Sequence, residues 1–269
     1  MASANKIRPD LSSIAGLMLA GGAIIGGLVL EGGSIKDILQ FTAAIIVIGG
    51  TFGAVMVNFP LHVVIGGFKR FIHVFLDSSP DVGELVEVIV NYSTKARKQG
   101  IVALEQDMNE AADPFLKKAL GLAVDGTDLQ ELRRMLELQI DQDEHHAEQE
   151  AKVWESAGGY APTIGIIGAV MGLIQVMKNL ADIDEVGHGI AVAFVATVYG
   201  VAFSNIIFLP ASNKIKARIQ AETRRKEVIL EGVSAMVEGL NPKLIRVKLE
   251  AYLTGHGSAA ATPAPKDES

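Results

Sequence analysis

Cysteine is absent from the sequence, tryptophan occurs once, and the other aromatic residues are few. Without cysteine, disulfides and thiolate metal sites are excluded, and redox chemistry gives no indication of the compartment. A basic face is also missing, because the formal net charge is −7 and the acidic excess is concentrated between residues 60 and 156. We therefore expect no nucleic-acid partner.

Charged side chains are missing from four long apolar blocks, at residues 11–30, 38–59, 157–177 and 189–210. A transmembrane helix needs about 20 apolar residues, and a charge at its centre costs about 2.5–3.5 kcal/mol on insertion scales. Glycine is abundant, with 28 residues, as is typical of packed membrane helices. We predict an all-α polytopic membrane protein with four transmembrane helices and a helical cytoplasmic domain.

The first block has two interpretations. Lys6 and Arg8 precede an apolar run, as in a secretory signal. The run is long for a signal, however, and no small-residue cleavage site follows it. We interpret it as a retained span.

The orientation follows from basic residues near the span ends. Lys69 and Arg70 follow the second block, and Lys214, Lys216 and Arg218 follow the fourth, whereas the two opposite loops are short and lean acidic. We therefore expect both termini in the cytoplasm.

The polar segments complete the predicted domain organisation. We expect a cytoplasmic N-terminus at 1–10, a cytoplasmic helical domain at 60–156, cytoplasmic C-terminal helices at 211–254 and a disordered tail at 255–269. Within the helical domain, Ser79-Pro80 is a helix-start signal. A longer helix is predicted to start at 126–128 and to continue without a breaker to Gly158, and so into the third span.

Small residues recur at a spacing of four in all four apolar blocks, which allows helices to approach closely. Such pairs also arise by chance, but their presence in every block favours a packed bundle. The fourth block has the series Ala196, Gly200 and Ser204. The glycines expected at helix contacts are Gly22, Gly26, Gly49, Gly53, Gly168, Gly172 and Gly200.

Two prolines and a threonine stand out in the third and fourth blocks. Pro162 lies near the cytoplasmic start of one and Pro210 at the cytoplasmic end of the other, so antiparallel spans would place both at one mouth. Counting along each helix places Ala169 and Thr197 near mid-membrane. The plain structural alternatives are a helix end at Pro210 and a Thr197 hydroxyl bonded one turn back.

An acid is missing from all four blocks, although ion carriers usually place an ionisable group in the membrane. Either the chain moves nothing, or a partner subunit supplies the acid. Enzyme motifs are also lacking, and His145-His146 lies in an acidic segment without metal-ligand spacing. We expect neither an enzyme nor a bound cofactor or metal.

Several short motifs occur in the order and spacing of a known family. They are APTIGIIGAVMGL at 161–173, ATVYG at 196–200, SN at 204–205, RKQG at 97–100, LE at 104–105, VDG at 124–126, EG at 231–232 and NP at 241–242. This pattern resembles the MotA/PomA family of flagellar motor stator subunits, within the MotA/TolQ/ExbB proton channel superfamily. Two spans precede the large polar segment, whereas TolQ and ExbB have one, so the flagellar branch is favoured.

The resemblance implies an assembly and its partners. The chain would form a homo-oligomer, a ring of five copies around two copies of a single-span MotB-like subunit, among the lipids of the bacterial inner membrane. An aspartate of that subunit would carry the ion. The complex would generate torque on the rotor protein FliG.

The resemblance also implies residue roles. Pro162 and Pro210 match prolines that couple ion flow to conformational change. Arg97 and Glu105 match the charged pair that engages FliG, and Lys98 is an auxiliary. Without the resemblance, exposed charges of this kind are usually solvated surface.

The transported ion is the remaining expectation. Sodium-driven members carry threonine in the third span where this chain has Ala169, although Thr197 is retained, which favours protons. The alternatives are a sodium-driven PomA-like stator, an ExbB/TolQ-like energising complex for outer-membrane processes, and a non-conducting membrane scaffold.

Overall fold

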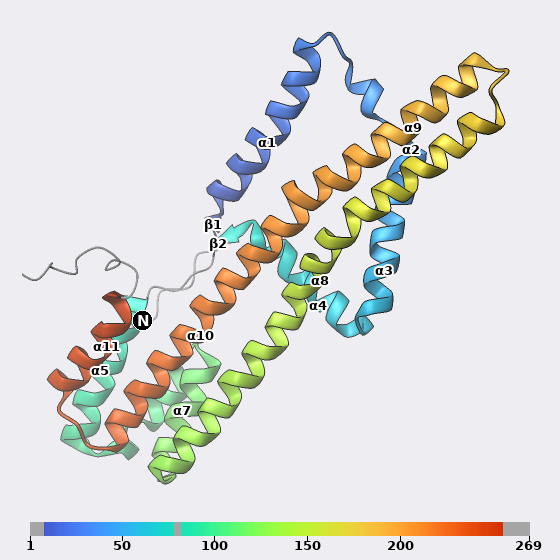
Figure 1. Ribbon diagram of the computed structural model, residues 1–269. Coiled ribbons are helices and arrows are strands. Elements are labelled where there is room, and N and C mark those ends of the chain that lie inside the picture. The colour runs from blue at the N-terminus through green and yellow to red at the C-terminus, as the bar shows by residue number, and fades with distance from the viewer. Residues whose placement is uncertain (1–7, 78–81, 255–269) are drawn as a thin grey trace, which may run out of the picture. The chain divides into compact units, whose positions relative to one another are not determined.

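The computed structural model describes residues 8–77 and 82–254 (Figure 1). The helix start predicted at Ser79-Pro80 and the disordered tail predicted at 255–269 lie outside the described residues. Contacts divide the chain into two compact units. Among the described residues, unit 1 contains 82–144 and 220–254, and unit 2 contains 8–77 and 145–219.

Unit 2 contains the apolar helices of the chain. They are α1 (Leu11–Leu30), the short 3-10 helix η1 (Ile35–Ile38), α2 (Phe41–Ala44), the π-helix η2 (Ile45–Gly49), α3 (Gly50–Asn58), α4 (Leu61–Val74) and parts of the longer helices below. Asp10 caps α1 by accepting a hydrogen bond from the Ser13 amide, 3.0 Å away. Helix α4, which buries Val63, Val64 and Val74, was not predicted from the sequence.

The third span belongs to a single helix of 50 residues, α8 (Leu129–Lys178), which contributes to both units. The prediction of a long helix that continues into the span is confirmed. Gly158 does not interrupt it, and Pro162 lies inside it. Local breakers therefore do not end this helix, because contacts with a neighbouring helix stabilise it at these positions.

The fourth span is likewise continuous with the helix that follows. The elements α9 (Ile183–Ala202), the π-helix η4 (Phe203–Phe208) and α10 (Leu209–Val237) follow one another without a break. Pro210 is therefore not a helix end, and that structural alternative is wrong. Pro210 lies in the first turn of α10, directly after the wider π-helical turns of η4, and these turns leave room for the proline ring.

In the described part of the chain, four helices are long and apolar enough to cross a membrane. They lie at Leu11–Leu30 and Phe41–Asn58 and within Leu129–Lys178 and Ile183–Val237. The predicted all-α membrane fold is confirmed. The only strands among the described residues are the two-residue β1 (Arg8–Pro9) and β2 (Leu76–Asp77), which pair antiparallel.

Unit 1 packs short helices around the charged ends of α8 and α10. It contains α5 (Val82–Gln99), the 3-10 helix η3 (Ile101–Leu104), α6 (Glu105–Glu110), α7 (Pro114–Val124) and α11 (Pro242–Thr254). Its core includes Leu132, Leu136 and Ile140 of α8, which recur on one face of that helix. Ile89 and Ile245 contribute from α5 and α11.

Three glycines with positive φ follow helix ends in unit 1, Gly100 after α5 and two others that share one hydrogen-bond pattern. Gly126 follows α7 with φ 73°, and Gly239 follows α10 with φ 76°. In each case the next amide, of Thr127 or Leu240, donates to the carbonyl five residues back. This is the Schellman arrangement, and an L side chain at the left-handed position would be strained.

Candidate functional site

The α8–α9 hairpin is held together by close backbone contact. A Cβ added to Gly200 would lie 2.5 Å from the carbonyl oxygen of Ala161. One added to Gly172 would lie 2.6 Å from the carbonyl oxygen of Gly189. Gly165 and Gly189 also make close contacts, each at 2.8 Å, but were absent from the predicted packing set, because their partners depend on the register of the hairpin.

The other predicted packing glycines differ among themselves. Gly168 packs against Ala196, whose Cβ would lie 2.7 Å from an added Cβ. For the remaining four, an added Cβ would meet nothing within 4 Å among residues 8–77 and 82–254; these are Gly22, Gly26, Gly49 and Gly53. In the described chain α1 has no buried residue, and Figure 1 shows it separate from the α8–α9 hairpin along most of its length.

The hairpin register separates the two prolines. Pro162 lies beside Gly200, since its Cα would be 3.2 Å from a Cβ added there. Pro210 follows Gly200 by about ten residues in a continuous helix, which corresponds to ~15 Å. The expectation that both prolines share one mouth is therefore wrong. Span ends read from charges do not determine the register, which is set by the glycine contacts.

Pro162 leaves a backbone carbonyl of α8 without its usual donor. Proline has no N–H, so the carbonyl four residues earlier, at Gly158, lacks the bond that an α-helix normally provides. The Ser204 hydroxyl of η4 donates to this carbonyl at 2.7 Å. Ser204 is 2% exposed, so water does not compete for the carbonyl from that side.

The π-helical turn before Pro210 contacts the same point of α8. The Leu209 amide donates to the Ser204 carbonyl, five residues back. The Leu209 side chain packs against Gly158, where an added Cβ would lie 2.5 Å from Leu209 Cδ2. Ser204 and Leu209 thus connect the segment before Pro210 to the turn of α8 that contains Pro162.

Thr197 and Ala169 lie further along the hairpin, away from Pro210. The Thr197 hydroxyl donates to the Ala193 carbonyl one turn back, at 3.2 Å, as the structural alternative proposed. Thr197 Cα would be 3.5 Å from a Cβ added to Gly165. Thr197, Ala169 and Pro162 are all half-buried in the isolated chain.

A wide apolar surface of the hairpin is not covered by any of the residues that the structure describes. Its exposed side chains include Ile166, Val170 and Leu173 from α8 and Phe194, Val198 and Val201 from α9. Asn205 is also exposed, and its side-chain amide donates to the Val201 carbonyl at 2.9 Å. We call this exposed set the open face of the hairpin.

Trp154, the only tryptophan, lies at the centre of an aromatic cluster. It stacks on Phe71 with ring centroids 4.3 Å apart and meets Phe68 and Phe208 at 5.0 and 5.7 Å. These rings come from α4, α8 and η4. The cluster could not be predicted from the sequence, because the rings come together only after three separate helices pack.

The three charged residues of the RKQG and LE motifs lie in unit 1. Arg97 and Lys98 are in the last turn of α5, and Glu105 starts α6. All three are exposed, and none of them has an ion-pair partner among the described residues. Nearby, Lys95 and Asp107 form an ion pair of 2.5 Å that joins α5 to α6.

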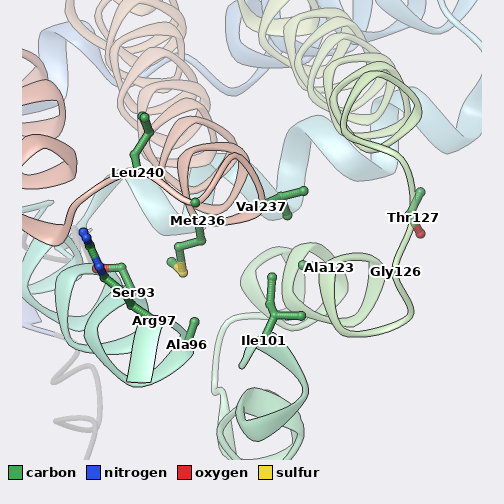
Figure 2. Close-up of a pocket in the computed structure, with 11 residues that line it drawn as sticks. Ser93, Ala96, Arg97, Ile101, Ala123, Gly126, Thr127, Met236, Val237 and Leu240 are labelled. Atoms are coloured by element: carbon green, nitrogen blue, oxygen red, sulfur yellow. The ribbon is translucent and has the colours of Figure 1, made fainter. Parts of the chain in front are cut away.

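A hollow of about 300 Å³ lies beside Arg97. Figure 2 shows that its lining comes from α5, from the ends of α7 and α10 and from the start of η3. Besides Arg97 the wall is mostly apolar, with Ile101, Ala123, Met236 and Leu240. The glycine-terminated ends of α7 and α10 shape the hollow, so backbone turns rather than long side chains form part of its rim.

Glu231 of the EG motif connects three helices of unit 1. It forms ion pairs with Lys248 of α11 and with Arg133 of α8, the latter at 3.0 Å. Burial raises the pKa of Glu231, but hydrogen bonds from Lys248 and Arg133 outweigh it, so the pKa is below its ordinary value. The adjacent Gly232 packs against Ile89, because an added Cβ would lie 2.5 Å from it.

Comparison with known proteins identifies the family of this chain. Residues 107–228 match the MotA/TolQ/ExbB proton channel family, and residues 14–100 match the family Motility protein A N-terminal. Motility protein A of Bacillus subtilis is 35% identical over 91% of each chain. Motility protein A of Helicobacter pylori is 36% identical over 91% of this chain and 95% of its own.

The solved structures agree with the sequence relatives. The structure of Campylobacter jejuni MotAB contains a chain with a TM-score of 0.87 and 31% identity, covering 94% of this chain and 99% of that one. The protein therefore belongs to the MotA/TolQ/ExbB proton channel family. Within it, the chain is a MotA-like stator subunit of the bacterial flagellar motor, and the alternative of an ExbB/TolQ-like complex is not favoured.

Proposed function

We propose that this subunit forms half of a proton path, and that a single-span MotB-like partner supplies the titrating aspartate. The observation that carries this is the open face of the hairpin. It is bordered by Pro162, Ala169 and Thr197, and the predicted spans contain no acid of their own. A partner helix on this face would bring a carboxylate to a site that lacks one.

The assembly we propose is a ring of five copies around two copies of the partner. Uncovered apolar side chains on the hairpin and on α1 provide contact surface for neighbouring copies, for the partner and for lipid. The mass of the purified complex tests this stoichiometry. A complex with any other subunit ratio would contradict it.

We propose protons as the driving ion, because Ala169 has no hydroxyl with which to coordinate sodium. Swimming speed should remain unchanged when sodium is replaced by potassium at constant pH, and it should collapse with a protonophore. A speed that falls with sodium would exclude the proton path. A complex of this chain with its partner that conducts no protons would instead support a non-conducting scaffold.

The torque step follows from the energy available per proton. A proton that crosses 100 mV releases about 2.3 kcal/mol, enough to shift a two-state packed element. We propose that protonation of the partner's aspartate changes the packing of the hairpin. Since α8 and α10 each contribute to both units, the change is transmitted along continuous helices.

We propose that Arg97, Lys98 and Glu105 form the contact with the rotor protein FliG. They are exposed and lack ion-pair partners among the described residues, so their charges are available to another protein. The hollow beside Arg97 offers space for an apolar side chain of the rotor.

Charge reversal tests the rotor contact. Arg97→Glu together with Glu105→Lys should abolish rotation while ion flux and complex assembly persist. Lys117→Glu, an exposed reversal on α7, is the matched control and should rotate normally. If the doubly reversed chain rotates like the control, these residues are not the rotor contact.

We also propose an inner-membrane location with both termini in the cytoplasm. The chain has no cysteine, so single cysteines can be introduced without background. An impermeant maleimide applied to intact spheroplasts should label Lys36→Cys and should not label Lys117→Cys. The reverse pattern would invert the topology.

A further inference from the structure

We propose that Ser204 is a positioning residue: its hydroxyl replaces the backbone donor that Pro162 removes and so fixes the proline turn of α8 against η4. This role rests on the proposed function. Pro162 is inside α8, and Gly158 is the residue four positions earlier. Gly158 therefore has a carbonyl that the helix itself cannot satisfy. Ser204 donates to it at 2.7 Å from a buried position.

Ser204 also belongs to the segment that leads into Pro210. Its carbonyl accepts the Leu209 amide across a π-helical turn, and Leu209 packs on Gly158. A movement of the proline turn in α8 is therefore opposed by a bond from η4, and a movement of η4 changes the partner of the Gly158 carbonyl. Through this bond, the two proline-containing segments shift together although the prolines are well separated.

The chain contains a matched control for this bond. Ser212 of α10 donates to the Ala151 carbonyl of α8 at 3.1 Å and is also buried. Position 155, four residues after Ala151, is glutamate and has an amide, so the helix already provides a donor there. Loss of the Ser212 hydroxyl leaves no carbonyl unpaired, whereas loss of the Ser204 hydroxyl does.

A double-mutant cycle on the purified full complex with its partner tests the bond. Ser204→Ala should lower the unfolding midpoint by about 2–4 °C when residue 162 is proline. In a Pro162→Ala chain the new amide supplies the donor, so Ser204→Ala should have little further effect. Ser212→Ala should cause the same small shift in both backgrounds.

The positioning role is tested by rotation, with motors counted for assembled stators. Ser204→Ala should assemble yet rotate at least several-fold more slowly at high load. Ser212→Ala should match the wild type, and Ser204→Cys, which retains a weak donor, should recover part of the speed.

Other results of these experiments would overturn the bond's role, the positioning role or the proposed function. If Ser204→Ala lowered the unfolding midpoint equally with proline and with alanine at position 162, the role of the bond would be overturned. Failure of Ser204→Ala to assemble in both backgrounds would overturn it too. Rotation of Ser204→Ala at the Ser212→Ala speed would overturn the positioning role. The proposed function fails separately, if the wild-type chain with its partner gives neither flux nor rotation.

Discussion

The indole N–H of Trp154 donates to the backbone carbonyl of Gly67 at 2.8 Å, and this bond joins α8 to α4. Trp154 is 2% exposed. Gly67 permits the approach, because a Cβ there would lie 2.9 Å from the Glu150 carbonyl oxygen and 3.1 Å from Val153 Cβ. The bond is an additional one for a carbonyl of α4, and it fixes the indole ring against that helix.

Trp154→Phe should destabilise unit 2 by about 0.5–1.5 kcal/mol, since it keeps a ring in the cluster but removes the indole hydrogen bond, while the Gly67 carbonyl remains within the hydrogen-bonded helix α4. Thermal unfolding of the purified complex measures this. Phe71→Leu, which removes a ring but no hydrogen bond, is the comparison. A Trp154→Phe midpoint equal to that of the wild type would show that this hydrogen bond contributes no stability.

Gly200→Ala should destabilise the hairpin by about 1–3 kcal/mol, because the new methyl group would meet the backbone of Ala161 and Pro162. Gly26→Ala should not destabilise the separate chain, since that position faces open space within it. Unfolding of the separate chain and of the assembled complex in detergent distinguishes the two variants. A Gly26→Ala defect seen only in the assembly would locate a contact between copies; an unaffected Gly200→Ala would contradict the hairpin contact.

Asp10 should contribute stability that depends on pH in one direction. Hydrogen bonds from Lys214, Ser12 and the Ser13 amide hold its pKa well below the ordinary 3.8. A lowered folded-state pKa gives stability that is complete above the ordinary value and is lost as the pH falls through the lowered one.

Asp10→Asn retains a helix-capping oxygen but removes the charge, so it should cost about 1 kcal/mol at neutral pH. The deficit relative to the wild type should be constant from pH 8 to about 5 and should shrink in more acidic solution. Unfolding midpoints across this range measure it. Asp182→Asn, at the cap of α9, is the control; an equal, pH-independent loss for both would refute the ion-pair explanation.

Glu231→Gln should loosen α11, because Lys248 and Arg133 would lose a shared carboxylate, at a cost of about 1–3 kcal/mol. Hydrogen exchange of the α11 amides should become faster. Glu87→Gln removes the ion-pair partner of Arg246, which also lies in α11. That pair is exposed, so the effect of this substitution should be small. Similar exchange rates in both variants would argue against a special role for Glu231.

The sequence predicted the elements that depend on local chemistry. Long uninterrupted apolar runs are stable in the hydrocarbon core of a membrane, which excludes charged side chains. The four predicted spans follow from this. The helix start predicted at 126–128 follows from residue-specific backbone preferences, and the structure confirms it, since Gly126 has a positive φ and α8 begins at Leu129. The family motifs added the stator assignment, which similarity over 91% of the chain supports.

The sequence could not predict features that depend on contacts between distant segments. Pro210 is a helix breaker by local rules, yet the helix continues, because η4 widens before it. The separation of Pro162 from Pro210 depends on the hairpin register. That register is selected by glycine contacts between two helices and leaves no periodic signal in either one.

The amino-acid sequence by itself determined that this chain resides in a membrane, has no acid in its predicted spans and carries the motifs of a stator subunit. Only the tertiary structure decided which glycines are in contact, where Trp154 binds and which hydroxyl satisfies the carbonyl before Pro162. The physical reason is that composition and periodicity are properties of single helices. A hydrogen bond such as that from Ser204 to Gly158 exists only after two helices have packed.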